Sequence, residues 1–205
     1  MNKPLIYTGG LAATNAYLLN LDGHLLAVDA PEGFLDFLKQ KKIKPHSLFL
    51  THGHWDHIWD AADLAEWAGC PVYYHPDTAF LCLEPDAMLS FGLPKKLRPV
   101  HATQLLDETT PPPSSWPQAQ LLHVPGHCPG SLCLHLPRSG QLFGGDVLFE
   151  DGVGRWDLPG GSREILLDGI RKKILPLPES TIVYPGHGPS TTVGREKISN
   201  PFLQT

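Results

Sequence analysis

An apolar strand runs straight into a group of histidines in the segment Leu48-Phe49-Leu50-Thr51-His52-Gly53-His54-Trp55-Asp56-His57. Because side chains alternate along a strand, His52 and His54 at its carboxyl end point to the same side, and Gly53 permits a turn that brings Asp56 and His57 round to them. The chain has 11 histidines in 205 residues, so chance does not account for this H-x-H-x-D-H pattern. Imidazoles with a carboxylate suit Zn(II) or Fe(II) better than Mg(II) or Ca(II), which prefer oxygen ligands.

Three further ligand candidates follow predicted strands, each directly after a glycine. They lie in Pro125-Gly126-His127, Gly144-Gly145-Asp146 and Pro185-Gly186-His187-Gly188. A glycine lets the backbone turn sharply where a strand leaves a sheet, so side chains from separate strands can converge there. We therefore expect one metal cluster at one sheet edge. A purely structural site is disfavoured, since such sites favour cysteine-rich shells.

Length and composition limit the number of domains and the kinds of partner that the protein is expected to have. A chain of 205 residues fits one domain. Sixteen Lys and Arg against 21 Asp and Glu give a formal net charge of -5, which disfavours binding to nucleic acid or to an anionic membrane. The sequence has no apolar run of the roughly 20 residues that a membrane helix needs, and its start lacks the pattern of a secretory signal. The four cysteines form no C-x-x-C pair, so we expect reduced thiols in a cytoplasmic protein.

Apolar runs between turn residues predict strands over residues 16–19, 25–28, 47–50, 72–74, 119–124, 132–136, 141–143 and 181–184. Helices are expected over 34–42, 60–69 and 162–175. In the last of these, Ser162 can cap the amino end, and Leu166, Ile170 and Ile174 share one face. The proline-rich segment 109–117 predicts an exposed connection between two halves.

On these motifs the sequence resembles the metallo-β-lactamase superfamily and, within it, the single-domain glyoxalase II-like (hydroxyacylglutathione hydrolase-like) branch. The resemblance implies an αββα sandwich, with two mixed β-sheets flanked by helices. It also implies two divalent metal ions, zinc first, with iron or manganese as alternatives. By motif, one ion would be held by His52, His54 and His127, the other by Asp56, His57 and His187, and Asp146 would bridge them. The implied reaction is hydrolysis of a thioester such as S-D-lactoylglutathione by a hydroxide that bridges the metals, with Asp56 as the catalytic residue that orients it.

The residues after Asp146 resemble the branch's G-D-x-L-F…G-R-x-D-x-P-G-G stretch and carry the predicted substrate contacts. Arg155 stands where two-domain relatives place a basic residue against glutathione, and Arg can clamp a carboxylate with two hydrogen bonds. The alternative for Arg155 is an ion pair with Asp157. Trp156 is expected to supply an apolar pocket wall. Only 18 residues follow His187, so we expect one domain over 1–205 without the C-terminal helical glutathione-binding domain.

Other readings of the sequence remain open. The main rival function is a persulfide dioxygenase, whose relatives share this fold but use O₂ at a single Fe(II) and act on glutathione persulfide. A β-lactamase, a nuclease and a non-catalytic metal-binding protein are disfavoured. The segment 85–101 is a candidate lid, with Met88 and Phe91 and with basic residues that could hold an anionic acyl-thiol substrate, namely Lys95, Lys96 and Arg98.

Several residues near the motifs are expected to have structural roles. Cys128 is predicted to be a small buried side chain, and Trp55 and Trp59 to pack rather than to contact substrate. The histidines outside the motifs are expected to be core or surface residues rather than ligands; these are His24, His46, His75, His101, His123 and His135.

Overall fold

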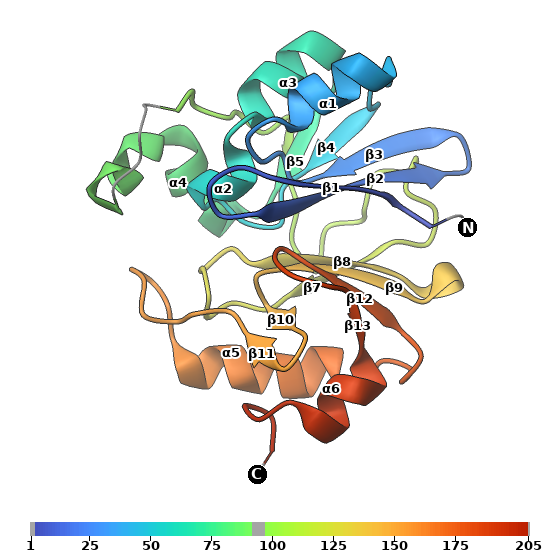
Figure 1. The fold of residues 1–205 in the computed structure, drawn as a ribbon, viewed down its shortest axis with the longest axis vertical. Helices are drawn as coiled ribbons and strands as arrows, with labels where there is room; N and C mark the ends of the chain where they lie inside the picture. Colours follow the sequence, from blue (N-terminus) through green and yellow to red (C-terminus); the bar gives the residue numbers. More distant parts are fainter. Residues whose placement is uncertain (1–2, 92–96, 205) are drawn as a thin grey trace.

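The computed structural model describes residues 3–91 and 97–204. Two mixed β-sheets pack face to face and helices cover both outer faces, as Figure 1 shows. The expected αββα sandwich is therefore confirmed.

The first sheet is built by the first half of the chain. Its strands neighbour one another in chain order, β1 (Leu5–Gly9), β2 (Thr14–Leu21), β3 (His24–Val28), β4 (Ser47–Phe49), β5 (Val72–Tyr74) and β6 (Gln104–Leu105). The first three are antiparallel and the later pairs are parallel. Asp22 and Gly23 turn β2 into β3 with φ angles of 51° and 97°, because a two-residue hairpin turn of this kind needs positive φ.

The second sheet is built by the second half of the chain. Its strands lie in the order β13 (Thr191–Thr192), β12 (Ile182–Pro185), β9 (Gln141–Gly145), β8 (Leu132–Leu136) and β7 (Gln120–His123). β12 and β9 are parallel and the other neighbours are antiparallel. A small hairpin of β10 (Leu148–Phe149) and β11 (Gly152–Val153) follows β9.

Helices cover the outer faces of both sheets and create three apolar layers. α1 (Phe34–Lys41) and α3 (Ala61–Ala68) lie over the first sheet, and α5 (Arg163–Gly169) and α6 (Val193–Ser199) lie over the second (Figure 1). One cluster of buried side chains lies between each sheet and its helices, and a third fills the space between the sheets. β8 and β9 are buried along their whole length, as expected for strands covered on both faces.

The helix expected over 162–175 has two parts. Ser162 caps its start, because the Ser162 hydroxyl accepts a hydrogen bond from the Ile165 amide. The α-helical part ends at Gly169, and residues Ile170–Ile174 continue as a π-helix (η4). The apolar face is kept throughout, since Leu166, Ile170 and Ile174 are all buried.

The proline-rich connection joins β6 of the first sheet to β7 of the second, as expected. It is not exposed throughout. Trp116 is 2% exposed and lies in the layer between the sheets, where its indole Nε1 donates to Ser47 Oγ at 3.2 Å. This side chain anchors the connection to the core.

Short helical elements follow the strand ends at one side of the molecule. α2 (Trp55–Ile58), η1 (Pro76–Thr78), α4 (Ala79–Leu83) and η2 (Pro85–Phe91) all belong to the first half. In the described part of the chain, no helix is both long enough and apolar enough to span a bilayer.

The candidate lid is only partly described by the structure. Lys95 and Lys96 lie outside the described residues. The Arg98 guanidinium pairs with the carboxylates of Asp63 and Glu66 on α3, so the expectation that it faces a substrate is corrected.

Candidate metal centre

The loop after β4 and the short helix α2 carry four of the predicted ligands, His52, His54, Asp56 and His57. Gly53 between the first two has no space for a side chain, because a Cβ there would lie 2.8 Å from the Leu81 Cβ. The glycine therefore lets the ligand loop pack directly against α4.

The second sheet supplies the other three predicted ligands, which follow β7, β9 and β12 and are His127, Asp146 and His187. The glycines that precede Asp146 and His187 are required for different physical reasons. Gly145 has a φ of 51°, which favours glycine. A Cβ on Gly186 would lie 2.1 Å from Asp146 Oδ1, so this position must be bare for the cluster to form.

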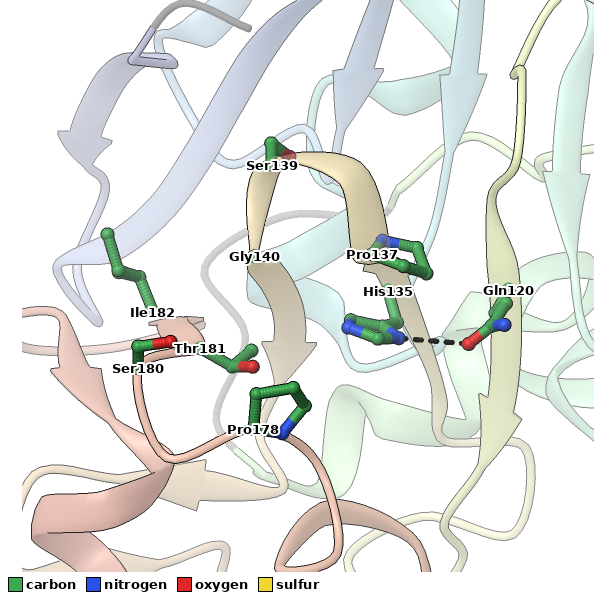
Figure 2. A pocket seen from close by; sticks show the side chains of 9 residues that line it. All are labelled: Gln120, His135, Pro137, Ser139, Gly140, Pro178, Ser180, Thr181 and Ile182. Carbon is green, nitrogen blue, oxygen red and sulfur yellow. Dashed lines mark hydrogen bonds between the residues drawn. The ribbon is translucent and has the colours of Figure 1, made fainter.

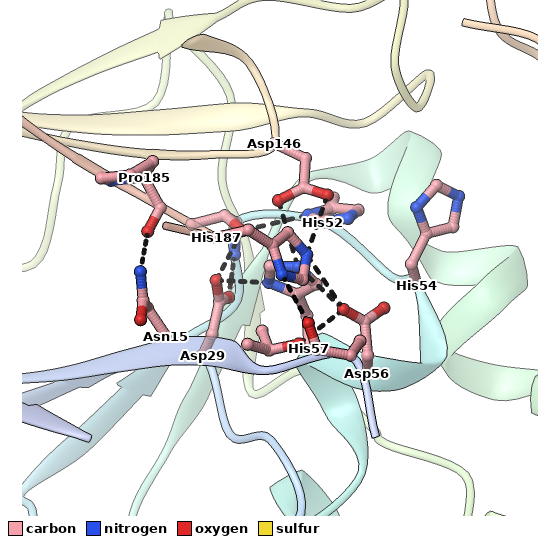
Figure 3. A network of polar contacts seen from close by, with 12 residues as sticks. Asn15, Asp29, His52, His54, Asp56, His57, Asp146, Pro185 and His187 are labelled. Carbon is pink, nitrogen blue, oxygen red and sulfur yellow. Dashed lines mark hydrogen bonds and ion pairs between the residues drawn. The ribbon is translucent and has the colours of Figure 1, made fainter. Parts of the chain in front are cut away.

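All seven predicted ligands come together: two groups of three contain six of them, and a third group, of His52, His57 and Asp146, links these two. Figure 3 labels all of these residues except His127. One group offers three imidazole nitrogens, from His52, His54 and His127. The other offers a carboxylate oxygen and two imidazole nitrogens, from Asp56, His57 and His187. Within each group the donor atoms lie within 4.8 Å of one another. Asp146 lies between the groups, with Oδ1 3.2 Å from His57 Nε2 and Oδ2 3.5 Å from His127 Nε2.

Asp29 is a buried carboxylate behind the cluster that the sequence analysis did not identify. It is 2% exposed. Its Oδ2 accepts hydrogen bonds from His57 Nδ1 and from Thr51 Oγ1, both at 2.8 Å, and its Oδ1 accepts from the Thr51 amide at 2.8 Å. Asp29 directly follows the strand β3, so its place at a strand end was the one signal in the sequence.

Hydrogen bonds to groups outside the cluster fix the tautomers of four histidines. His57 Nδ1 donates to Asp29, His127 Nδ1 to the Arg155 carbonyl at 2.8 Å, and His187 Nδ1 to the Ala12 carbonyl at 3.1 Å. The Thr51 hydroxyl donates to Asp29, so it accepts from His52 Nδ1 at 3.1 Å. In each case Nε2 is left facing the cluster, which is how metal-binding histidines are usually held.

The inward-facing atoms fit a cation. His57 Nε2 and Asp146 Oδ1 are buried, face each other at 3.2 Å and have no other hydrogen-bond partner. His187 Nε2 faces Asp56 Oδ2 at 3.2 Å and Asp146 Oδ2 at 3.3 Å. Such nitrogens need a proton or a metal ion between them and the carboxylates. Divalent cations of the zinc, iron and manganese class are bound by this donor set.

The protein environment sets the protonation state of the candidate ligands, which must lose their protons to bind a cation. Burial lowers the pKa of His52 and of His127, and it lowers that of His54 to about 3, so these imidazoles are neutral at pH 7. Burial opposes ionisation of Asp56, but the charge of His57 lowers the pKa of that carboxyl to about 2. Burial also opposes charge on His57 and His187, but the carboxylates of Asp56 and Asp146 raise the pKa of both imidazoles, that of His187 to about 10. These two imidazoles therefore carry protons that a bound cation would displace.

Two neighbouring side chains from β2 hold parts of the cluster in place, Asn15 the segment around His187 and Thr14 the carboxylate of Asp56. Asn15 Nδ2 donates to the carbonyls of Pro185 at 3.1 Å and Gly188 at 2.9 Å (Figure 3). Thr14 Oγ1 donates to Asp56 Oδ2 at 2.7 Å. The first sheet thus fixes the position of His187, which belongs to the second.

A pocket of about 620 Å³ opens over the cluster between the two halves of the chain. Arg155 lines it, but its guanidinium makes two hydrogen bonds to Asp157, at 2.8 and 2.7 Å. Trp156 is placed elsewhere. Its ring packs near Phe202 and under the Arg163 guanidinium, so the expectation of a pocket wall is corrected, because Leu158 and Pro159 line the pocket on that side.

The histidines outside the motifs are mostly accounted for by packing. His135 Nδ1 is 3.0 Å from Gln120 Oε1 in a separate pocket lined by residues of the second half (Figure 2). His75 and His123 stack with ring centroids 3.9 Å apart and, with Asp77, form a further group that could hold an ion. No motif in the sequence predicted this grouping.

The remaining candidates divide between the core and the pocket. Cys128 is fully buried, burial raises the pKa of its thiol, and it belongs to none of the metal-capable groups found among the described residues. Trp59 packs in the first core cluster, whereas Trp55 lines the pocket.

Two curated bacterial relatives are similar to this chain over most of its length. The "Probable metallo-hydrolase YqgX" of Bacillus subtilis is 37% identical over 202 residues, which cover 95% of this chain and 94% of the relative. The "Hydroxyacylglutathione hydrolase GloC" of Haemophilus influenzae is 37% identical over 160 residues, which cover 77% of this chain and 76% of the relative.

Two solved structures have a fold similar to that of this chain. TTHA1623 in a di-iron-bound form has a TM-score of 0.87 and 36% identity, and the match covers 97% of this chain and all of that one. BLEG-1, described as a B3 metallo-beta-lactamase, also has a TM-score of 0.87, with 35% identity over 99% of this chain and all of that one. The family profile of the Metallo-beta-lactamase superfamily matches residues 9–187. This match, together with the fold and the cluster, shows that the chain belongs to the metallo-β-lactamase superfamily.

Proposed function

We propose that the protein hydrolyses acyl thioesters with the help of two divalent metal ions. The observation that carries this proposal is the position of Asp146, whose two oxygens face one histidine from each ligand group, His57 and His127. Asp146 is thereby placed where it could join two ions, whereas the rival dioxygenase would use a single Fe(II). The di-iron form of TTHA1623 supports the binuclear proposal.

The pocket favours attack by water rather than by a side chain. Among its described lining residues, none is Ser, Thr, Cys or Lys, the groups that usually form covalent intermediates. When bound, a pair of divalent cations supplies an acidified water and polarises a carbonyl. Asp56 is ionised, with a pKa of about 2, and Thr14 holds one of its oxygens. Asp56 can therefore accept a hydrogen bond from the attacking water and orient it.

The thioester class is supported by the relative named hydroxyacylglutathione hydrolase and by Arg155 at the pocket wall. A carboxylate of a glutathione thioester could replace Asp157 on the Arg155 guanidinium, since both side chains are exposed, 61% and 62% respectively. Exposed pairs of this kind contribute little to stability and can exchange partners.

The test is anaerobic hydrolysis of S-D-lactoylglutathione by protein loaded with zinc, manganese or iron, followed as loss of the thioester. We expect kcat/KM of about 10⁴ M⁻¹s⁻¹ or more, loss of activity in Asp56→Ala, and no change in Asp36→Ala, an exposed carboxylate on α1. A chelator should abolish the activity, and added metal should restore it.

Two experimental results would overturn this proposal and assign another activity. Oxygen uptake on glutathione persulfide with one equivalent of iron, and no thioester hydrolysis, would assign a persulfide dioxygenase. Turnover of a β-lactam alone would assign the activity that the description of BLEG-1 names.

A further inference from the structure

We propose that the wall of the metal pocket formed by α4 and η2 binds an apolar acyl chain of the substrate. This inference rests on the proposed thioester hydrolysis and specifies its substrate class as thioesters with an apolar acyl group longer than lactoyl.

Exposed apolar side chains are concentrated on this segment. Among the described residues, eight large apolar side chains are exposed. Three of them, Phe80, Leu83 and Leu89, lie within ten consecutive positions, with exposed fractions of 64%, 37% and 41%. Single exposed apolar residues are ordinary, whereas a group of them indicates an interaction surface.

The segment is anchored, so its exposed side chains have defined positions. Cys82 and Met88 are buried in the first core cluster with exposures of 0% and 1%, and the Val100 amide donates to the Cys82 carbonyl at 2.8 Å. Just before α4, Thr78 Oγ1 donates to the Gly130 carbonyl at 3.1 Å. The exposure of Phe80 is therefore part of a fixed surface rather than the result of a loose end.

Phe80, the most exposed of these three side chains, lines the same pocket as the candidate ligands, whereas Leu83 and Leu89 are not among its lining residues. Phe80, Leu81, Ala87, Met88 and Trp55 form one wall. A substrate carbonyl placed over Asp56 and Asp146 would have this wall within reach of one of its two substituents.

The part of the pocket lining that follows β11 has a different chemistry. Arg155 and Asp157 form it together with Leu158 and Pro159, and the paired charges there suit a polar thiol such as glutathione. A thioester that spans the pocket would therefore place its thiol half on this wall and its acyl half against α4 and η2. A lactoyl group can place only one methyl group against an apolar wall. A longer alkyl chain would cover more of the wall and so remove more apolar surface from water.

The direct test is binding of S-alkylglutathione thioethers, which cannot be hydrolysed, to the metal-loaded protein by titration calorimetry. In the series methyl, butyl, hexyl and octyl, we expect Kd to fall by about two- to fourfold per added methylene until the wall is covered, since a fully buried methylene gives about fourfold. Phe80→Ser should flatten this dependence. Ile198→Ser is the matched control, because Ile198 is an exposed apolar residue on α6, 76% exposed and outside the pocket, and it should leave the dependence unchanged.

Hydrolysis of the matching S-acylglutathiones separates this inference from the proposed function. A rise of kcat/KM with acyl length, lost in Phe80→Ser, supports both. Equal Kd values along the thioether series would overturn the subsite even if S-D-lactoylglutathione is hydrolysed. If Kd falls with thioether chain length as expected but no thioester is hydrolysed, the apolar subsite is supported and thioester hydrolysis is overturned. If Phe80→Ser instead converts a dimer to a monomer in light scattering, with the chain-length dependence intact, the surface is a contact between copies and the subsite is refuted.

Discussion

Replacing Asp29 by Asn should weaken metal binding at one ligand group more than at the other. The carboxylate accepts three hydrogen bonds, two at Oδ2 and one at Oδ1. The Asn amide has one oxygen that can accept hydrogen bonds, and its NH₂ group can only donate them. The NH₂ group would therefore face either the Thr51 backbone N–H or the two donors at Oδ2, which are His57 Nδ1 and the Thr51 hydroxyl. The backbone does not oppose the change, because Asp29 has a φ of 58°, a conformation that Asn tolerates well.

The size of the effect follows from the loss of the carboxylate that orients His57. Removing such a partner typically lowers metal affinity 10- to 100-fold, and a buried donor without an acceptor costs about 1–3 kcal/mol of stability. We expect the affinity of the group containing Asp56, His57 and His187 to fall in this range, with a smaller change for the group containing His54 and His127.

The measurement is competition with a chromophoric chelator, which gives the affinity of each ion, together with urea unfolding of the metal-free protein. Thr51→Ser is the control, since it keeps the hydroxyl that donates to Asp29 Oδ2 and should leave both affinities nearly unchanged. Two unchanged metal affinities in Asp29→Asn would refute the idea that this carboxylate positions a ligand.

Three further predictions concern residues around the centre. Arg155→Ala should raise KM for S-D-lactoylglutathione with little change in kcat, whereas Asp157→Ala should lower KM by freeing the guanidinium; equal kinetics in both variants would exclude Arg155 from substrate binding. Burial raises the pKa of the Cys128 thiol, which is therefore uncharged at pH 7, so disulfide reagents should label it about tenfold or more slower in the native than in the unfolded protein; rapid native labelling would contradict this. Ser162→Ala should destabilise the protein by about 1 kcal/mol in urea unfolding by removing the acceptor for the Ile165 amide, and Ser162→Asp, which keeps a capping group, should not.

The grouping of the candidate ligands could be predicted because its signal is local. Strand ends and glycines place His127, Asp146 and His187 at one sheet edge, and the structure brings them to His52 and His57. Asp29 was missed because it has no histidine or glycine ligand motif beside it, and its role depends on a contact with His57, 28 positions away.

The pocket walls could be predicted less well, because their orientation depends on tertiary packing. Trp156 and Arg155 are neighbours in the sequence, yet one packs near Phe202 and the other lines the pocket. α4 is only five residues long, too short for a helical period to show in the sequence. Phe80 therefore gave no sign of the surface that it forms.

The division of ligands between the two sheets also sets the order of events during synthesis. Each group combines residues of the first sheet with a residue of the second, and the last of these, His187, follows His52 by 135 positions. At a translation rate of about 5–20 residues per second, roughly ten seconds separate the two. During that interval the nascent chain presents His52, His54, Asp56 and His57 without their partners. A metal ion could therefore find a complete set of ligands only after the second sheet has been made and has docked onto the first.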